Sequence, residues 1–150
     1  MSGSKCYEYR ALRCVEFADT DLAGIVHWSN FFRYLEVAEH EFFRYVGLST
    51  QMKVDGQVIG WPRVHVECEL IHPLKFEDEV EVHLVVREIG RRSIRYNFTL
   101  SRVSGSKREL VARGKYAATC VRVLQEAGEI ESMSIPGVFL EKIGEAPPDN

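Results

Sequence analysis

The sequence predicts an α+β domain in which one long amphipathic helix packs across the apolar face of a curved antiparallel β-sheet. Two patterns lead to this prediction. Apolar residues recur at helical spacing from Phe31 to Tyr45, whereas after Pro62 the apolar period changes to two. Consecutive alternating strands with short turns form an antiparallel sheet with one polar face. The preceding helix covers the other face most economically.

The length and composition are those of one soluble globular domain. The 150 residues fit a single domain spanning positions 1–150, and hydrophobic and charged residues make up 45% and 27% of them. The net charge of -3 argues against a dedicated nucleic-acid binder, which would normally be basic. No internal repeat or low-complexity linker interrupts the chain.

The N-terminus and the cysteines indicate a cytoplasmic protein. The first residues lack the apolar run of a signal peptide, and no apolar stretch is long enough to span a bilayer. The four cysteines are scattered without a C-x-x-C pair. Reduced thiols and the absence of a metal site are therefore the expectation.

The first third of the chain reads as strand, loop and helix. The stretch Tyr7–Phe17 is rich in aromatic and branched residues and predicts a strand, and Ala18–Trp28 predicts a loop. Ser29 or Asn30 is expected to cap the helix, which ends at Gly47. The polar side of this helix is expected to carry Arg33, Glu36, Glu39, His40, Glu41 and Arg44.

The rest of the chain is expected to supply most of the sheet. Residues 49–60 read as an irregular loop, and strands are expected over 63–70, 79–86, 94–101 and 110–123. A short C-terminal helix is expected over 137–143, followed by a frayed tail over 145–150.

The densest set of chemically capable residues is the segment Asp19–Trp28, directly before the helix. It places two carboxylates and a histidine beside a helix N-terminus, where unpaired N–H groups would stabilise a developing oxyanion. A nearby carboxylate would attack a carbonyl directly or activate a water. A turn in which Thr20 and Asp21 bond to local backbone explains the same residues equally well. The apolar residues around Gly24 favour a pocket.

Residues 19–36 resemble the motif of the 4-hydroxybenzoyl-CoA thioesterase family over nearly twenty positions. In this chain it reads Asp-Thr-Asp-Leu-Ala-Gly-Ile-Val-His-Trp-Ser-Asn-Phe-Phe-Arg-Tyr-Leu-Glu. Two further stretches, 64–80 and 90–93, resemble the family in the expected order. The resemblance implies the hotdog fold, a curved antiparallel sheet wrapped around one long central helix. It also implies dimers or tetramers that hydrolyse acyl-CoA thioesters in a site shared between subunits.

The resemblance also implies roles for individual residues. Asp21 falls on the family's catalytic carboxylate, and Trp28 would supply the backbone N–H that polarises the thioester carbonyl. Gly24 would let the loop approach the ligand closely, and Asp19 reads as structural. His27 departs from the residue pairs common in relatives, so a substrate-orienting role and a packing role both stay open. No cofactor is expected, since CoA is part of the substrate.

The CoA contacts are expected in the turn Arg91-Arg92-Ser93, with Arg87 and Arg95 adding positive charge, because guanidinium groups suit phosphate. A solvated strand face explains these arginines equally well. The main alternative function is a hotdog domain that binds acyl-CoA or an acyl carrier without turnover. A hydratase on the same fold would need a different helix motif. The presence of Asp21 and Gly24 favours the thioesterase, and its acyl group stays open.

Overall fold

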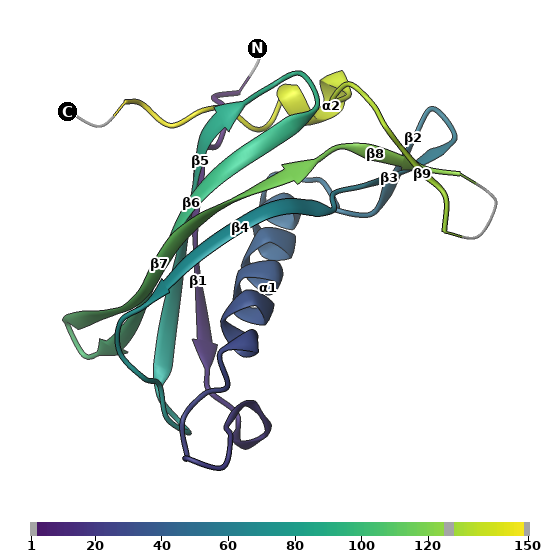
Figure 1. Ribbon diagram of the computed structural model, residues 1–150. Coiled ribbons are helices and arrows are strands. Elements are labelled where there is room, and N and C mark those ends of the chain that lie inside the picture. The colour runs from purple at the N-terminus through teal and green to yellow at the C-terminus, as the bar shows by residue number, and fades with distance from the viewer. Residues whose placement is uncertain (1–2, 125–127, 149–150) are drawn as a thin grey trace.

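A computed structural model describes residues 3–124 and 128–148. Its longest helix lies against a strongly curved sheet, and a smaller sheet projects to one side (Figure 1). The elements follow the order β1 Glu8–Cys14, a 3-10 turn Phe17–Asp19, α1 Ser29–Tyr45, β2 Met52–Val54, β3 Gln57–Gly60, β4 Arg63–Leu70, β5 Glu79–Ile89, β6 Ser93–Ser104, β7 Lys107–Thr119, β8 Val121–Val123, β9 Ile130–Ser132 and α2 Gly137–Leu140.

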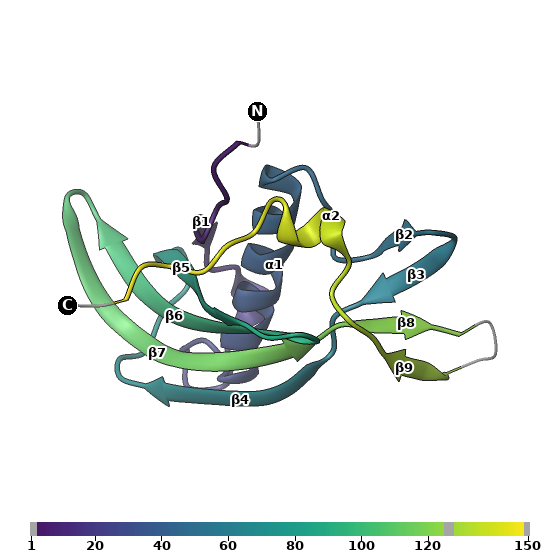
Figure 2. The same ribbon diagram turned by 90° about the horizontal axis from the view of Figure 1, so that it is seen from above.

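The main sheet has the strand order β1-β5-β6-β7-β4, and each pairing in it is antiparallel. Seen from above, this sheet wraps around α1 (Figure 2). Alternate residues of β5, from Val80 to Val86, are fully buried against the helix, and the residues between them face outward. This period of two places one strand face in the core. The predicted α+β arrangement, with a curved sheet around a long helix, is confirmed.

The helix α1 buries the predicted apolar stripe, which includes Phe31, Leu35, Ala38 and Phe42. One assignment on its polar side is wrong. Glu39 is only 1% exposed, although the helical pattern placed it among the solvated residues.

Glu39 is buried because strands β4 and β7 supply its partners. Its Oε2 accepts a hydrogen bond from Arg63 at 2.8 Å and another from the Tyr116 hydroxyl. Burial raises the pKa of Glu39, and the Arg63 charge opposes that shift. A buried carboxylate is tolerated in a core only with such partners.

Residues 49–60, expected to be irregular, contain a β-hairpin formed by β2 and β3. The turn at Asp55 and Gly56 has positive φ at both positions, +52° and +79°. Asp-Gly is the dipeptide that this type of hairpin turn favours. The strand β3 also pairs with β8, which continues the line of β7 beyond Cys120, and β9 completes the small sheet of order β2-β3-β8-β9.

The C-terminal segment returns to the main sheet. The helix α2 ends at Leu140 and is shorter than the predicted 137–143, because the chain turns so that Ile143 forms a bridge with Cys6. The following residues, expected to be frayed, are held by β5: the Ala146 N–H donates to the Val86 carbonyl at 2.8 Å, and Glu145 accepts the Ile89 N–H at 3.0 Å. Residues 149 and 150 of the expected tail lie outside the described part of the chain.

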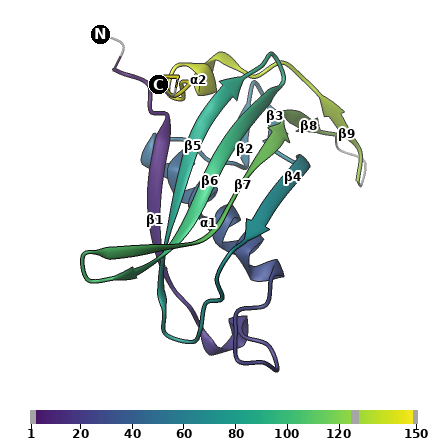
Figure 3. The same ribbon diagram turned by 60° about the vertical axis from the view of Figure 1, so that its left-hand side comes forward.

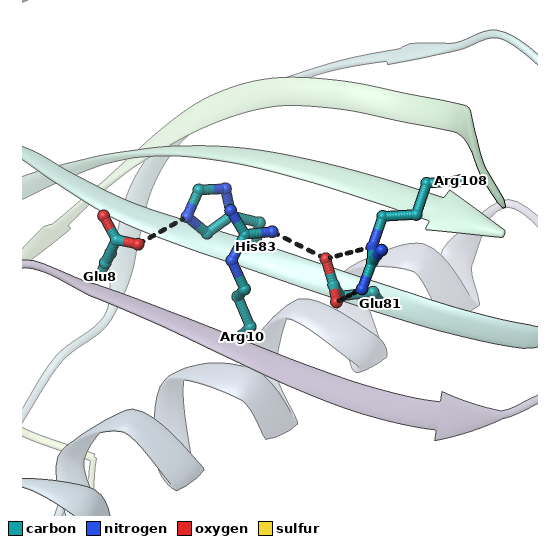
Figure 4. A network of polar contacts seen from close by, with 5 residues as sticks. All are labelled: Glu8, Arg10, Glu81, His83 and Arg108. Carbon is teal, nitrogen blue, oxygen red and sulfur yellow. Dashed lines mark hydrogen bonds and ion pairs between the residues drawn. The ribbon is translucent and has the colours of Figure 1, made fainter. Parts of the chain in front are cut away.

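The outer face of the sheet carries a polar network across three strands (Figure 4). Glu81 on β5 accepts hydrogen bonds from Arg10 of β1 at 2.8 Å and from Arg108 of β7 at 3.0 and 3.2 Å. The His83 ring lies 3.5 Å from the Glu8 carboxylate. These contacts tie β1 and the β6–β7 hairpin to β5 on the side that α1 does not cover.

Candidate functional site

The segment between β1 and α1 forms a tight hairpin at the N-terminal end of the helix, at the bottom of Figure 1. The Asp21 N–H donates to the Ile25 carbonyl at 2.8 Å, and the Gly24 N–H donates to the Asp21 carbonyl at 3.0 Å. Gly24 has a φ of +81°, in the left-handed region that glycine adopts without strain. Thr20 and Val26 form an antiparallel bridge that closes the hairpin.

The carboxylate of Asp21 is held by its own hairpin on one side. Its Oδ1 accepts the Ala23 N–H at 2.9 Å and the Ile25 N–H at 3.5 Å. The residue is exposed, and within the described residues Oδ2 accepts no hydrogen bond. Oδ1 therefore bonds to the local backbone, as expected for a turn residue, whereas Oδ2 is available to a ligand or a water.

Asp19 has a structural part in this loop. Its Oδ2 accepts hydrogen bonds from the Glu16 N–H at 2.9 Å and from the Tyr34 hydroxyl at 2.8 Å. Its carbonyl accepts the His27 N–H at 2.9 Å and the Asn30 side-chain amide at 2.8 Å. Both ends of the hairpin are thus fixed to the first turns of α1.

The start of α1 differs from the expected cap. Trp28 occupies the cap position, and Ser29 and Asn30 lie inside the first turn. The Ser29 N–H donates to Nδ1 of His27 at 3.3 Å, and Ser29 Oγ lies 2.8 Å from the same nitrogen. The imidazole of His27 therefore takes the place of the expected serine or asparagine cap.

The Trp28 N–H points to no acceptor in hydrogen-bond geometry among residues 3–124 and 128–148. It belongs to the free donors at a helix N-terminus, where the helix dipole favours negative charge. The Trp28 side chain is 58% exposed and lies against the His27 ring, with 5.5 Å between the ring centroids. An exposed aromatic surface thus borders this donor.

The turn Arg91-Arg92-Ser93 lies at the other end of the molecule. It joins β5 to β6 beside α2, whereas the Asp21 hairpin lies at the opposite end of α1, in both Figure 1 and Figure 3. Arg91 donates to the Ser134 hydroxyl at 3.2 Å, and the Arg91 and Arg92 carbonyls accept the Ile135 and Cys120 N–H groups. One chain therefore does not bring the predicted CoA contacts to Asp21.

Comparison with known proteins identifies the family. Residues 15–143 match the model of the thioesterase-like superfamily. The chain belongs to this superfamily. It is 35% identical to a putative esterase of Aquifex aeolicus over 129 residues, which cover 86% of this chain and 92% of the relative.

Other superfamily members act on named thioesters. The chain is 26% identical to the 4-hydroxybenzoyl-CoA thioesterase of Pseudomonas sp. strain CBS-3, over 85% of this chain and 91% of the relative. The solved structure of that enzyme superposes with a TM-score of 0.77 at 22% identity, covering 91% of this chain and 99% of the other. The hotdog fold and the predicted class, a thioester hydrolase, are confirmed at the level of the superfamily.

Sequence reasoning missed the residues that brace the hairpin. Asn30 was expected as a possible cap and Tyr34 fell within the apolar stripe of the helix, yet both also donate to Asp19. Their spacing of four residues on one helix face is the signal that could have identified them, since such residues are neighbours on the helix surface. Glu36, which matches the acidic helix residue of the family motif, is exposed and lies 3.8 Å from His40.

Proposed function

We propose that this protein hydrolyses the thioester bond of an acyl- or aroyl-CoA, with Asp21 as nucleophile or general base and the Trp28 N–H as oxyanion donor. One observation carries the proposal. The hairpin before α1 leaves one oxygen of Asp21 and the N–H of Trp28 without partners among the described residues. The members of the superfamily named above supply the reaction class.

The register of the hairpin supports cooperation between these two groups. Asp21 lies opposite Ile25, and Asp19 lies opposite His27, so Trp28 directly follows the last paired residue of the hairpin that carries Asp21. The donor and the carboxylate belong to one braced unit. Such preorganised groups stabilise a transition state without reorganising during the reaction.

Two balanced routes lead to the same products. In the first route, Oδ2 of Asp21 bonds to the thioester carbon, the C–S bond breaks, CoA thiolate leaves, and water then splits the mixed anhydride. In the second route, Asp21 takes a proton from a water whose oxygen bonds to that carbon, the C–S bond then breaks, and the CoA thiolate leaves. An ordinary thiol has a pKa near 8.5, so the thiolate leaves without a strong general acid.

His27 is proposed to position the donor rather than to touch the substrate. Its Nδ1 accepts the Ser29 N–H and so shapes the first turn of α1. Since this nitrogen is engaged within the loop, any contact with a ligand would fall to Nε2.

A complete site is proposed to need a second copy of the chain. The strand β4 is an edge of the main sheet, and Val64, Val66 and Leu70 on it are 63%, 41% and 52% exposed. An exposed apolar edge strand is a ready surface for pairing. A second subunit there would bring another Arg91–Ser93 turn to the assembly, which is the arrangement expected for CoA contacts shared between subunits.

Thiol release from aromatic, short and long acyl-CoAs tests the proposal. Asp21→Asn keeps Oδ1 for the Ala23 N–H, so the loop is retained while the carboxylate is lost. Asp55→Asn, in the exposed β2–β3 turn, is the matched control. We expect kcat to fall by a factor of about a hundred or more in Asp21→Asn alone.

The outcomes separate enzyme from binding domain. Unchanged turnover in Asp21→Asn would refute the residue assignment. A wild-type protein that binds acyl-CoA and releases no thiol would support the non-catalytic alternative.

No helix among the described residues is long and apolar enough to cross a membrane. The cytoplasmic location expected from the sequence stays a prediction.

A further inference from the structure

A small basic pocket lies on the outer face of the sheet, the face that α1 does not cover. Its volume is about 220 Å3, and neighbouring strands β4, β5, β6 and β7 all contribute to it. The polar side chains that line it belong to His65, Arg87, Glu88, Arg95, Asn97 and Lys115. The proposed hydrolysis uses none of these side chains, although Arg87 and Arg95 were expected to add positive charge near the CoA contacts.

The strand register indicates why the outer face is hollowed beside the pocket. Ala117 of β7 pairs with Arg95 on one side and with His65 on the other. Ala117 is only 1% exposed, yet it lies outside the hydrophobic core cluster that contains its neighbours Tyr116 and Ala118. Larger side chains on the outer face therefore cover it. The small side chain of Ala117, between the larger side chains of Arg95 and His65, leaves a hollow at this position.

A bulge in β5 shapes the wall of the pocket. The pairing of β5 with β6 shifts register between Val86 and Glu88, at Arg87. Such bulges re-aim side chains at sheet positions that serve a particular purpose. Here Arg87 and Glu88 of β5 both line the pocket. Arg95 of β6 and Lys115 of β7 line it from the next two strands.

The charges at the pocket are predominantly positive. Glu67 serves two groups, since its carboxylate lies 2.8 Å from His65 and 3.9 Å from Lys115. Glu88 is the direct cross-strand partner of Arg95, but no ion pair joins the two, and Arg95 forms none with any residue in the described ranges. The Arg95 guanidinium is therefore available to an external anion.

We propose that this pocket binds a phosphate group. Its volume of about 220 Å3 is large enough for a phosphate. Arginine donates paired N–H groups to phosphate oxygens, and lysine adds a point charge. The identity of the phosphate carrier rests on the proposed function, which brings CoA to the protein. The pocket itself is argued independently of any thioester hydrolysis.

Calorimetric titration of the whole protein with inorganic phosphate, CoA and dephospho-CoA at low ionic strength tests the proposal. Asn97→Asp places a negative charge at the pocket without changing side-chain size, and Arg95→Gln removes the available guanidinium. Both positions are exposed, so folding is retained, which unfolding midpoints verify. Lys107→Gln, at the start of β7 in the distant β6–β7 hairpin, is the matched control.

We expect Asn97→Asp and Arg95→Gln to weaken phosphate binding about tenfold or more, and Lys107→Gln to leave it near the wild-type value. A preference for CoA over dephospho-CoA that disappears in Asn97→Asp would assign the pocket to the phosphomonoester of CoA. Equal binding of the two, with phosphate binding still dependent on Arg95, would assign it to free phosphate.

Two results would overturn the proposal that this pocket binds phosphate. One is wild-type protein that shows no saturable phosphate binding, and the other is equal binding in Arg95→Gln, Asn97→Asp and Lys107→Gln. Thiol release is measured separately. A protein that binds phosphate and hydrolyses no thioester would therefore refute the proposed function and leave the pocket in place.

Discussion

The Tyr34 hydroxyl donates a hydrogen bond of 2.8 Å to Oδ2 of Asp19, and this contact joins the second turn of α1 to the hairpin that carries Asp21. Tyr34 is 1% exposed. Burial and the hydrogen bond with Asp19 raise the pKa of Tyr34, so the phenol remains a donor at neutral pH. The hairpin that carries Asp21 is thus braced from the core rather than from the surface.

Removing this brace should reduce both stability and turnover. Tyr34→Phe leaves a carboxylate oxygen with only the Glu16 N–H, and a hydrogen bond to a charged group contributes about 1.5–3 kcal/mol. We expect a lower urea midpoint and a lower kcat, with KM less affected, because the brace positions the loop and does not contact substrate. Tyr45→Phe, on an exposed tyrosine of the same helix, is the control. Equal kcat in the two variants would contradict this role.

Gly24 should be required for its backbone conformation. A Cβ at this position meets no atom within 4 Å, but φ is +81°, so Gly24→Ala introduces strain without a clash. We expect Gly24→Ala to lower the free energy of unfolding by about 1 kcal/mol. Gly105 in the β6–β7 hairpin has a φ of +61° and open space, so Gly105→Ala should cost a similar amount.

The two glycine variants separate strain from function. Unfolding midpoints should fall in both, whereas thiol release at saturating substrate should fall in Gly24→Ala alone, because only that hairpin holds Asp21. Equal loss of turnover in both variants would mean that global stability, and not the loop, limits activity.

Local pattern predicted the main sheet and helix well, because burial there follows strict periods. The residues of β5 alternate between core and outer face, as their period of two requires. The β2–β3 hairpin was missed because its strands are only three and four residues long, too short to show a period. Its Asp55-Gly56 turn was the remaining signal.

Contacts between distant segments were out of reach of local pattern. Glu39 occupies a polar helix position, and only Arg63 and Tyr116, from strands far along the chain, make its burial possible. The same limit applies to the site. The motif predicted a catalytic role for Asp21, which stays a prediction, but the separation of the Arg91–Ser93 turn from it follows from how β5 and α1 lie in space.

Burial of Glu39 should make stability fall as pH rises. Its pKa lies above the ordinary 4.5 in the folded chain, so the folded state binds its proton more tightly than the unfolded state. The stability linked to this proton is fully present below the ordinary pKa and is lost as pH rises through the raised value. Glu39→Gln retains an acceptor for Tyr116. Because its amide does not titrate, the variant should not lose this stability as pH rises.

Urea unfolding of Glu39→Gln and wild type over a pH series checks this sign. The stability of the variant relative to wild type should increase from acidic to neutral pH. Glu41→Gln, on the same helix, should run parallel to wild type. A difference between Glu39→Gln and wild type that does not change with pH would show that the carboxyl titrates alike in both states.

Glu81 should produce the opposite dependence, because its partners favour the charged form. The hydrogen bond from Arg108, supported by the one from Arg10, lowers the pKa of Glu81 below 4.5. The resulting stability is present above the ordinary pKa and is lost as pH falls through the lowered value. Both arginines are about half exposed, so solvent screens them, and we expect Glu81→Gln to cost about 1 kcal/mol at neutral pH.

The measurement is again urea unfolding against pH, with Glu79→Gln on the same strand as the exposed control. Wild type and Glu81→Gln should converge in stability as pH falls below the ordinary glutamate pKa, since protonation then removes the charge that the mutation removes. Added salt should narrow their gap at neutral pH. A constant gap at all pH values would mean that Glu81 acts through packing, and that the network in Figure 4 does not depend on its charge.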